Sequence, residues 1–444
     1  MLDTREARLA RRIASQLKAR GSVAYLVGGC VRDLLLGRQP QDYDLATDAR
    51  PEQVLELFPK AQLVGAHFGV VLVREETAEV EVATFRSDHA YQDGRHPTVV
   101  EFETDPRQDV LRRDFTINAL LLEPETGQVL DFVGGRADLE AGLVRAIGDP
   151  QARFREDHLR LLRAIRFAAR LGFEIEPATL AAIQRERQSI RTTSAERIRD
   201  ELVRILTEGG ARRGFELLDQ SGLLEILLPE VAAMKGVPQP PEFHPEGDVW
   251  THVLLMLGTM RDPTPTLALG VLLHDVGKPG TFSVRERIRF DGHPELSARM
   301  AVEILMRLRF SNDQIRQVEA LAARHLRFKD VTRMRQSTLK RFLRLERFEE
   351  HLELHRLDCV ASHGLLDHYD FVRWKWEEIP QEQLRPQRLV SGHDLIRAGY
   401  QPGPAFSRML KAVEDAQLEG QIHTPEEALE LVRSLFGPAS PAGS

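Results

Sequence analysis

The first 145 residues alternate between short apolar runs and turns, whereas the remainder of the chain repeats apolar residues at helical spacing. The runs VAYLVGG, DYDLAT, GVVLV and VEVATF each have the length of one strand. Residues 3–20 instead form one apolar helical face that Gly21 terminates. After Gln151 the strand signals thin out, and Leu, Ala, Arg and Glu dominate. We therefore predict an α+β chain with an N-terminal mixed sheet followed by all-helical regions.

The length of 444 residues predicts about two to four domains. The stretch GVPQPPEFHPEG at 236–247 is rich in Pro and Gly and marks a boundary before a new helical segment. A second candidate boundary lies near Ile379-Pro380, and we expect the final GPASPAGS to be disordered.

Charge and cysteine content restrict the environment and partners of the chain. The net charge of −7 means that a polyanionic partner must be held by a local basic patch. The two cysteines, Cys30 and Cys359, suggest a reducing compartment. No run of 18 uncharged apolar residues occurs. These features predict a soluble cytoplasmic protein without a membrane partner, and they leave its oligomeric state open.

The segment LVGGCVRDLLLG, followed by QDYDLAT, is the first group of residues that suggests chemistry. Gly28 and Gly29 separate an apolar strand from a helical run, so backbone N–H groups can approach a phosphate, and Arg32 lies on the first helical turn. Asp42 and Asp44 are predicted on one face of a strand, where two carboxylates suit Mg²⁺ chelated by a triphosphate. A plain turn and a solvated acidic loop are the alternatives.

Two further segments combine arginine with acidic and amide side chains. LRRDFTINALL contains Arg112, Arg113, Asp114 and Asn118, and REDHLRLLRAIRF contains Glu156, Asp157, Arg160, Arg163 and Arg166. Residues 157, 160, 163 and 166 would form one stripe on a helix. A carboxylate beside a guanidinium matches the amino group and ring nitrogen of cytosine and adenine, so Asp157 and Arg160 would accept CTP and ATP. A surface salt-bridge ladder is the alternative.

These motifs, together with ERIRDEL at 196–202, resemble those of class II tRNA nucleotidyltransferases, the CCA-adding enzymes and their bacterial poly(A) polymerase relatives. The resemblance covers about residues 24–230. It implies a nucleotidyltransferase head (1–145), a helical neck with base template and RNA binding (146–235), and a helical tail with tRNA contacts (364–444). By this resemblance, the catalytic Mg²⁺ ligands are Asp42 and Asp44, the nucleotide is bound by Gly28, Gly29, Arg32, Arg113, Asp114 and Asn118, the base template is Glu156, Asp157 and Arg160, and the nucleotide-contacting helix continues through Arg163 and Arg166.

The resemblance implies attack of a tRNA 3′-hydroxyl on the α-phosphate of CTP or ATP. Glu81 is a candidate third carboxylate, although Glu79 shares its face and either one could simply be solvated. DGRHP at 93–97 resembles a loop that full CCA-adding and A-adding enzymes keep, which argues against a CC-only enzyme. Full CCA addition, A addition alone and poly(A) synthesis remain open.

Basic residues are concentrated in two stretches of this acidic chain. Residues 151–213 contain 14 arginines against nine acidic residues, and residues 324–350 contain nine basic residues against four acidic ones. Such stretches can neutralise RNA phosphates without reading bases, as recognition of a tRNA acceptor arm requires. Solvated helical faces are the alternative.

A second, separate pattern of histidines and aspartates occupies the middle of the chain. Its members are His252, His274, Asp275, His293, His325 and Asp358. Imidazole and carboxylate ligands suit a divalent transition metal, or a pair with Mg²⁺ or Mn²⁺. The span 244–363 resembles the HD phosphohydrolase superfamily, which implies metal-dependent hydrolysis of a phosphomonoester or 2′,3′-cyclic phosphate, with Lys278 steadying the phosphate. An inactive helical scaffold, a nucleotide phosphohydrolase with an inactive head, and a non-enzymatic RNA-binding protein are the alternatives.

Overall fold

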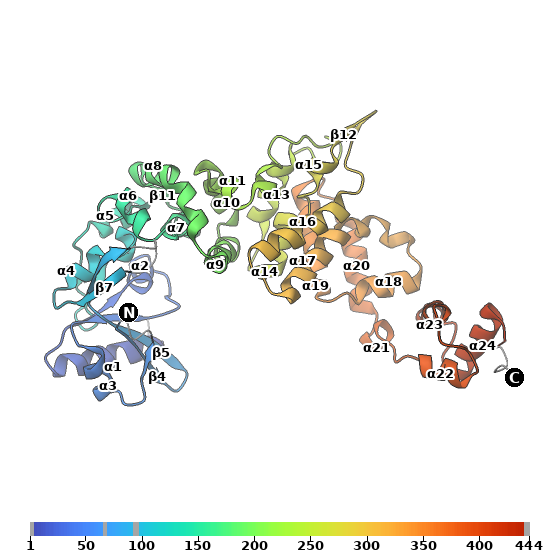
Figure 1. Cartoon of the computed structure of the whole chain (residues 1–444), viewed down its shortest axis with the longest axis horizontal. Helices are drawn as coiled ribbons and strands as arrows, with labels where there is room; N and C mark the ends of the chain where they lie inside the picture. The colour runs from blue at the N-terminus through green and yellow to red at the C-terminus, as the bar shows by residue number, and fades with distance from the viewer. Residues whose placement is uncertain (1–3, 65–68, 92–96, 439–444) are drawn as a thin grey trace. The chain divides into compact units, whose positions relative to one another are not determined.

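The structure is a computed structural model that describes residues 4–64, 69–91 and 97–438. The chain divides into two compact units, which Figure 1 shows coloured along the sequence. The first unit comprises residues 1–232 with 307–310, and the second comprises 233–306 with 311–444. The division after residue 232 lies close to the predicted Pro- and Gly-rich boundary at 236–247. The segment 93–96 of the predicted loop and the final residues 439–444 lie outside the described residues.

The first unit contains most of the strands of the described chain. Its elements are α1 (Arg5–Ala19), β1 (Ala24–Val27), α2 (Gly29–Leu35), β2 (Asp44–Thr47), α3 (Pro51–Leu57), β3 (Gln62–Val64), β4 (Val70–Glu75), β5 (Ala78–Thr84), β6 (Arg86–Tyr91), β7 (Pro97–Phe102), α4 (Pro106–Leu111), η2 (Thr116–Asn118), β8 (Leu121–Leu122), β9 (Val129–Leu130), α5 (Gly135–Ala141), β10 (Leu143–Val144), α6 (Pro150–Glu156), α7 (Arg160–Leu171), β11 (Glu174–Ile175), α8 (Pro177–Glu186), η3 (Arg187–Thr192), α9 (Ala195–Thr207), α10 (Ala211–Gln220), α11 (Leu223–Leu227) and α12 (Pro229–Ala232).

Seven strands form the central mixed sheet in the order β3-β4-β5-β2-β1-β8-β9. Only the β2–β5 pair within it is parallel. Along β5 buried and more exposed residues alternate, as a strand with one covered face requires. Helices α1 and α3 pack against the sheet in the blue part of the chain (Figure 1). The predicted mixed sheet, with strands at the four apolar runs, is confirmed.

The chain after residue 149 is helical for local reasons that the sequence shows. Asp149 caps α6 by accepting hydrogen bonds from the N–H groups of Gln151 and Ala152, and Pro150 begins the helix. Gly172 ends α7 in the left-handed conformation. The predicted helical character is confirmed, with three short strands, β11, β12 and β13, added to it.

The second unit is built almost entirely from helices. Its elements are α13 (Val249–Thr259), α14 (Pro265–Leu273), α15 (Lys278–Thr281), β12 (Ser283–Val284), β13 (Ile288–Arg289), α16 (His293–Arg307), α17 (Asn312–Arg324), η4 (His325–Arg333), α18 (Gln336–Leu343), α19 (Phe348–Ala361), α20 (Asp367–Glu378), α21 (Gln381–Leu384), α22 (Gly392–Arg397), α23 (Ala405–Leu418) and α24 (Pro425–Phe436).

Helix α14 lies at the centre of the helices that carry the histidine/aspartate pattern. Most of its residues are buried, and it packs against α13, α17 and α19. The helix ends at His274, so the pair His274-Asp275 follows directly from a buried apolar helix. None of the helices in the described ranges is both long and apolar enough to cross a membrane.

Candidate functional site

The turn between β1 and α2 brings the chain backbone to two charged side chains. Gly28 has a φ of 74°, a value that residues with a Cβ rarely adopt. A Cβ at this position would lie 3.7 Å from Nη1 of Arg113 and 3.9 Å from Oδ2 of Asp44. The Gly28-Gly29 turn therefore lies beside a guanidinium and a carboxylate.

Asp44 begins β2 and is paired in register with Glu81 on the parallel strand β5. Burial, then the charges of Glu81 and Asp42, raise the pKa of Asp44 to about 6, although Arg113 opposes the rise. Asp42 precedes the strand, so the prediction that both aspartates lie within one strand is wrong. The pairing of β2 with β1 ends at Val27–Asp44, where Gly28 turns the chain with a φ of 74°, and its pairing with β5 begins at the same residue, opposite Glu81.

A hydrogen-bonded chain of four side chains runs behind this turn. Arg32 donates to Oδ1 of Asn118 at 2.7 Å, and Asn118 donates to Asp114 at 3.2 Å. Arg163 donates to Oδ2 of Asp114 through Nε at 2.9 Å and Nη2 at 2.6 Å. Burial opposes ionisation of Asp114, but Arg163 outweighs it and lowers the pKa to about 2. Arg32, Asn118 and Asp114 are all buried, so this network holds Arg32 in one place.

The predicted base-template pair is joined by a backbone hydrogen bond, from the Arg160 N–H to the Asp157 carbonyl at 3.0 Å, but the two side chains have different partners. The carboxylate of Asp157 is held at 3.1 Å by Nη2 of Arg197, a residue of α9. Arg160 instead donates to Glu156 at 2.7 Å and to the carbonyl of Arg112 at 3.0 Å. Asp157 has non-helical backbone angles and ends α6, so the predicted four-residue helical stripe starts only at Arg160. The two template groups are thus fixed separately, each by another charged residue.

A cavity of about 450 Å³, called here the head cavity, gathers most of the predicted nucleotide-site residues. Ten of them line it: Gly28, Gly29, Arg32, Asp44, Arg113, Asp114, Asn118, Asp157, Arg160 and Arg163. Asp42, Glu156 and Arg166 are not part of this lining. Arg166 is buried and donates to Glu201 at 2.7 Å.

The head cavity also includes residues that the sequence did not single out. These are Leu159, Phe167, Arg170 and Arg197. The guanidinium groups of Arg32, Arg163 and Arg166 all lie within 5.4 Å of the Phe167 ring centre. Phe167 follows Arg166 in the same arginine-rich segment, and Arg197 lies inside ERIRDEL, so their proximity in sequence was the available signal.

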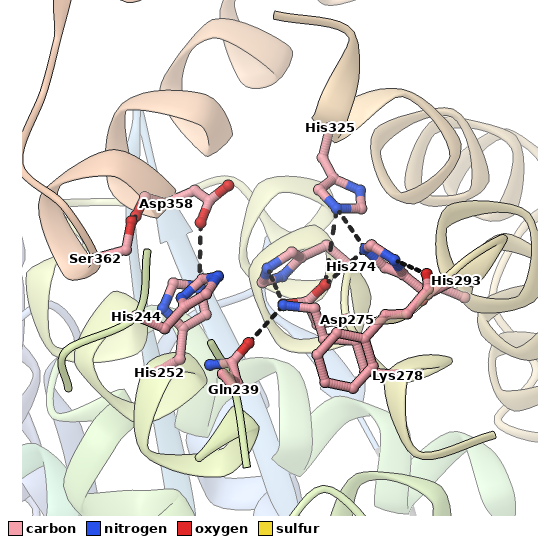
Figure 2. Close-up of polar contacts among 12 residues, drawn as sticks. Gln239, His244, His252, His274, Asp275, Lys278, His293, His325, Asp358 and Ser362 are labelled. Carbon is pink, nitrogen blue, oxygen red and sulfur yellow. Dashed lines mark hydrogen bonds and ion pairs between the residues drawn. The ribbon is translucent and has the colours of Figure 1, made fainter. Parts of the chain in front are cut away.

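The histidines and aspartates of the second unit converge at the end of α14, as Figure 2 shows. Among the described residues, two groups of three ligand atoms within 4.8 Å of one another share Asp275. One group adds His252 and His274 to Asp275, and the other adds His293 and His325. Oδ2 of Asp275 lies 3.2 Å from Nε2 of His274, and Oδ1 lies 3.3 Å from Nε2 of His293. The two oxygens of one carboxylate therefore face different histidines.

Asp358 from α19 and Glu246 complete this cluster around His252. Nε2 of His252 lies 3.1 Å from Oδ1 of Asp358, while Nδ1 lies 2.7 Å from Oε1 of Glu246. Burial lowers the pKa of His252, yet these two carboxylates outweigh it and raise the pKa to about 9. Glu246 also contacts His244 at 2.9 Å. The predicted span 244–363 begins at this segment, but His244 and Glu246 were not among the predicted ligands, although Glu246 lies only six residues before His252.

The cluster has the donor set of a site for divalent cations. Nε2 of His274 and Oδ1 of Asp275 are buried, and their contacts within the cluster at 3.2 and 3.3 Å do not have hydrogen-bond geometry. Burial without a partner is costly for such atoms, and imidazole nitrogen and carboxylate oxygen are metal ligands. Lys278, the predicted phosphate contact, is itself buried and donates to Gln239, with Oδ2 of Asp275 at 2.6 Å. The residues present therefore fit a bound metal.

Comparison with known proteins decides the family. The family model of the Poly A polymerase head domain matches residues 24–145. Models of an RNA- and SrmB-binding site of polymerase A and of tRNA nucleotidyltransferase domain 2 match 172–235 and 294–432. A CCA-adding enzyme from Levilactobacillus brevis is 31% identical over 426 residues, which cover 96% of each chain. This chain belongs to the CCA-adding enzyme family. The family resemblance predicted from the head motifs is confirmed.

Two further members show how far the CCA-adding enzyme likeness extends. The enzyme from Streptococcus gordonii is 31% identical over 424 residues, covering 94% of each chain. The crystal structure of the Bacillus stearothermophilus CCA-adding enzyme in complex with CTP superposes with a TM-score of 0.75 at 27% identity. That alignment covers 97% of this chain and 98% of the other. The family fold therefore extends over both compact units.

Proposed function

We propose that this chain adds C and A residues from CTP and ATP to the 3′ end of tRNA without a nucleic-acid template. The observation that carries the proposal is the head cavity, because Asp157 and Arg160 line the same cavity as Asp44 and Arg113. The similar enzyme from Bacillus stearothermophilus has been solved with CTP. The alternatives within the family, A addition alone and poly(A) synthesis, use the same residues.

The residues of the head cavity suggest a division of labour. Asp157 would accept a hydrogen bond from the amino group of cytosine or adenine, while Arg160 would donate to the neighbouring ring nitrogen. Uracil and guanine present the reverse pattern, so each would leave a charged group unpaired. Arg32 and Arg113 lie where they can bind the triphosphate. The tRNA 3′-hydroxyl oxygen forms a bond to the α-phosphorus as the bond to pyrophosphate breaks.

Asp42 and Asp44 are the residues that would hold Mg²⁺. The raised pKa of Asp44 reflects negative charge around it that a cation would neutralise, which is the support for this assignment. Bound Mg²⁺ supplies charge stabilisation at the reacting phosphate. Asp44 lies beside the Gly28-Gly29 turn, so the turn backbone and the carboxylate would meet the same triphosphate.

Product sequencing tests this function. tRNA transcripts ending at position 73 or 75 are incubated with CTP, ATP or both, and the added nucleotides are read. We expect ordered C and A addition by the natural chain, and at least a hundredfold loss in Asp42→Ala plus Asp44→Ala. Robust addition by the double variant would refute the assignment. A addition to the position-75 transcript without any C addition to the position-73 transcript would favour the A-adding alternative.

We further propose that the histidine/aspartate cluster is a metal-dependent phosphohydrolase that repairs tRNA 3′ ends. The specific support is the shared carboxylate of Asp275 between two histidine groups, together with the buried His274 Nε2 and Asp275 Oδ1 atoms that lack a well-formed hydrogen bond. Divalent cations there would supply a bound water as nucleophile for a phosphoester. Removing a terminal phosphate would expose the 3′-hydroxyl that the head extends, so the two activities would act in sequence.

Metal analysis and phosphatase assays test the second function. Asp275→Ala should lose bound metal and hydrolysis of a 3′-phosphorylated or 2′,3′-cyclic RNA end. Glu303→Ala removes an exposed carboxylate from α16, the helix that carries His293, and should change neither. Equal hydrolysis by the natural chain and Asp275→Ala would reject hydrolysis at this cluster and leave it a helical scaffold.

A further inference from the structure

A large cavity opens beside the histidine/aspartate cluster within the second unit. Its volume is about 760 Å³, in the upper part of the range of roughly 300–1,000 Å³ that is usual for ligand sites. Asp275, His293, His325 and Asp358 of the cluster belong to its lining. This space, called here the cluster cavity, exceeds what a single phosphate group needs. The other lining residues therefore indicate which groups a substrate has besides its phosphate.

The hairpin of β12 and β13 supplies basic side chains to the cluster cavity. Arg287 and Arg289 line it from the hairpin, and Lys329 lines it from η4. Three exposed carboxylates also contribute to the wall, from Glu242, Asp291 and Asp367. Attraction for an anion is therefore a local property of the hairpin and not of the whole cavity.

Arg289 differs from the paired arginines of the neck because its Nε is buried without a hydrogen-bond partner. The arginines at 153, 160, 163, 166 and 197 all donate to carboxylates. A buried guanidinium N–H that meets no acceptor is costly, and a phosphate oxygen is an acceptor of matching geometry. The unpaired donor of Arg289 thus points to an anionic group of a ligand.

The residue after Arg289 ties the hairpin to the cluster. The carbonyl of Phe290 accepts a hydrogen bond from Nδ1 of His293 at 2.8 Å, which leaves Nε2 of that ring facing Asp275. The ring of Phe290 also lies 5.3 Å from Nζ of Lys278. Arg289 therefore precedes a residue that contacts the cluster, and it lines the same cavity as Asp275 and His293.

The cluster cavity also has apolar surface that a phosphate cannot use. Phe243 and Leu365 both line it while 53% and 64% exposed. Phe290 and Ile288 add further apolar wall from the hairpin. Bases stack on aromatic rings such as those of Phe243 and Phe290 without regard to sequence.

We propose that the cluster cavity takes the last two nucleotides of an RNA strand, with Arg289 binding the phosphodiester that joins them. The terminal phosphate lies at the histidine/aspartate cluster, and a base covers Phe243 or Leu365. This inference rests on the proposed hydrolase function and gives its substrate class: a strand end, in preference to a mononucleotide, a nucleoside triphosphate or pyrophosphate. Arg289 is the specificity-determining residue.

Substrate comparison on the full, Mn²⁺-loaded chain tests this proposal. The substrates are a 3′-phosphorylated dinucleotide, cytidine 3′-monophosphate and p-nitrophenyl phosphate. Because Arg289→Gln removes one charged hydrogen bond to the substrate, we expect it to raise KM for the dinucleotide about tenfold or more and to leave kcat unchanged. Hydrolysis of the other two substrates should stay within twofold. Arg289→Lys should restore part of the affinity.

Arg285→Gln is the matched control, because Arg285 is exposed on the same hairpin and does not line the cluster cavity. It should leave all three substrates unchanged. If Arg289→Gln reduced the hydrolysis of p-nitrophenyl phosphate and of the dinucleotide equally, or reduced neither, the role of Arg289 would be overturned. A larger effect of Arg289→Gln on inhibition by CTP or pyrophosphate than on the dinucleotide would overturn the strand-end assignment.

A binding measurement separates this inference from the hydrolase proposal. Calorimetry follows a dinucleotide 3′-phosphorothioate binding to the metal-loaded natural chain and to Arg289→Gln. A tenfold lower affinity of the variant for the dinucleotide supports the inference even if no substrate is hydrolysed. In that case only the hydrolase proposal fails. Equal affinity of the two proteins overturns the inference whether or not hydrolysis occurs.

Discussion

Replacing Asp44 by asparagine should stabilise the metal-free protein at neutral pH. The folded pKa of about 6 lies above the ordinary value of 3.8 because the carboxyl is buried beside Glu81 and Asp42. Folding therefore favours the protonated form, and the associated stability is fully present below pH 3.8 and lost as the pH rises through 6. Two pKa units correspond to about 3 kcal/mol of unfolding free energy at pH 7.5, and to about 1 kcal/mol at pH 4.5.

Hydrogen exchange in β1, β2 and β5 is the suitable measurement, because all three tryptophans lie beyond residue 232 and cannot report on the sheet. In EDTA at pH 7.5, Asp44→Asn should slow exchange through global opening about a hundredfold relative to the natural chain. The ratio should fall to a fewfold at pH 4.5. Saturating Mg²⁺ should remove the difference in exchange rate between the two proteins at pH 7.5, because it stabilises only the natural chain.

Glu79→Gln provides the control for this experiment. Glu79 is exposed on β5 and pairs with Arg74, so its loss should change stability by less than about 0.5 kcal/mol at any pH. A pH-independent difference for Asp44→Asn, or a less stable variant at pH 7.5 in EDTA, would refute the reasoning that like charge and burial dominate at Asp44.

Three further changes test other parts of the first unit. Arg197→Gln frees the carboxylate of Asp157, so UTP incorporation relative to CTP should rise about tenfold in a competition assay, and an unchanged ratio would contradict this. Glu201→Ala leaves the buried guanidinium of Arg166 without its nearest carboxylate and should cost about 3 kcal/mol in urea unfolding followed by circular dichroism, whereas a loss below 1 kcal/mol would show that Arg166 finds another partner. Gly210→Ala places a Cβ 2.2 Å from a backbone carbonyl of α7 at a φ of 75°, so it should lower the melting temperature by several degrees, and an unchanged melting temperature would mean that α10 can shift freely.

Local signals predicted the fold well where one segment contains all the information. The Gly28-Gly29 turn, with an apolar strand before it and a helical run after it, needs no distant residue to be read. The end of α7 at Gly172 is another such case. Two-residue strands such as β11 were not predictable, because their pairing with β10 depends on tertiary packing and not on an alternating pattern.

The contacts within the candidate site were harder to predict from the sequence, because the residues that meet there are far apart along the chain. Spacing placed Asp157 beside Arg160, but the structure gives Asp157 a partner 40 positions later, in α9. The same holds for the cluster cavity, whose lining includes Asp275 together with Phe243 and Leu365, which are more than 120 residues apart in the chain. No periodic pattern connects such residues, so sequence reasoning identified the chemical groups and not their neighbours.

The pairing of arginines in the neck of the first unit has a consequence for the salt dependence of polyanion binding. The slope of affinity against salt concentration measures how many counterions the partners release, which requires cations that are free to neutralise phosphates. An arginine already held by a carboxylate, such as Arg166 by Glu201, has no such charge to offer without first breaking its ion pair. The 14 arginines of residues 151–213 therefore greatly overstate the number of ions that this segment can displace from a nucleic acid.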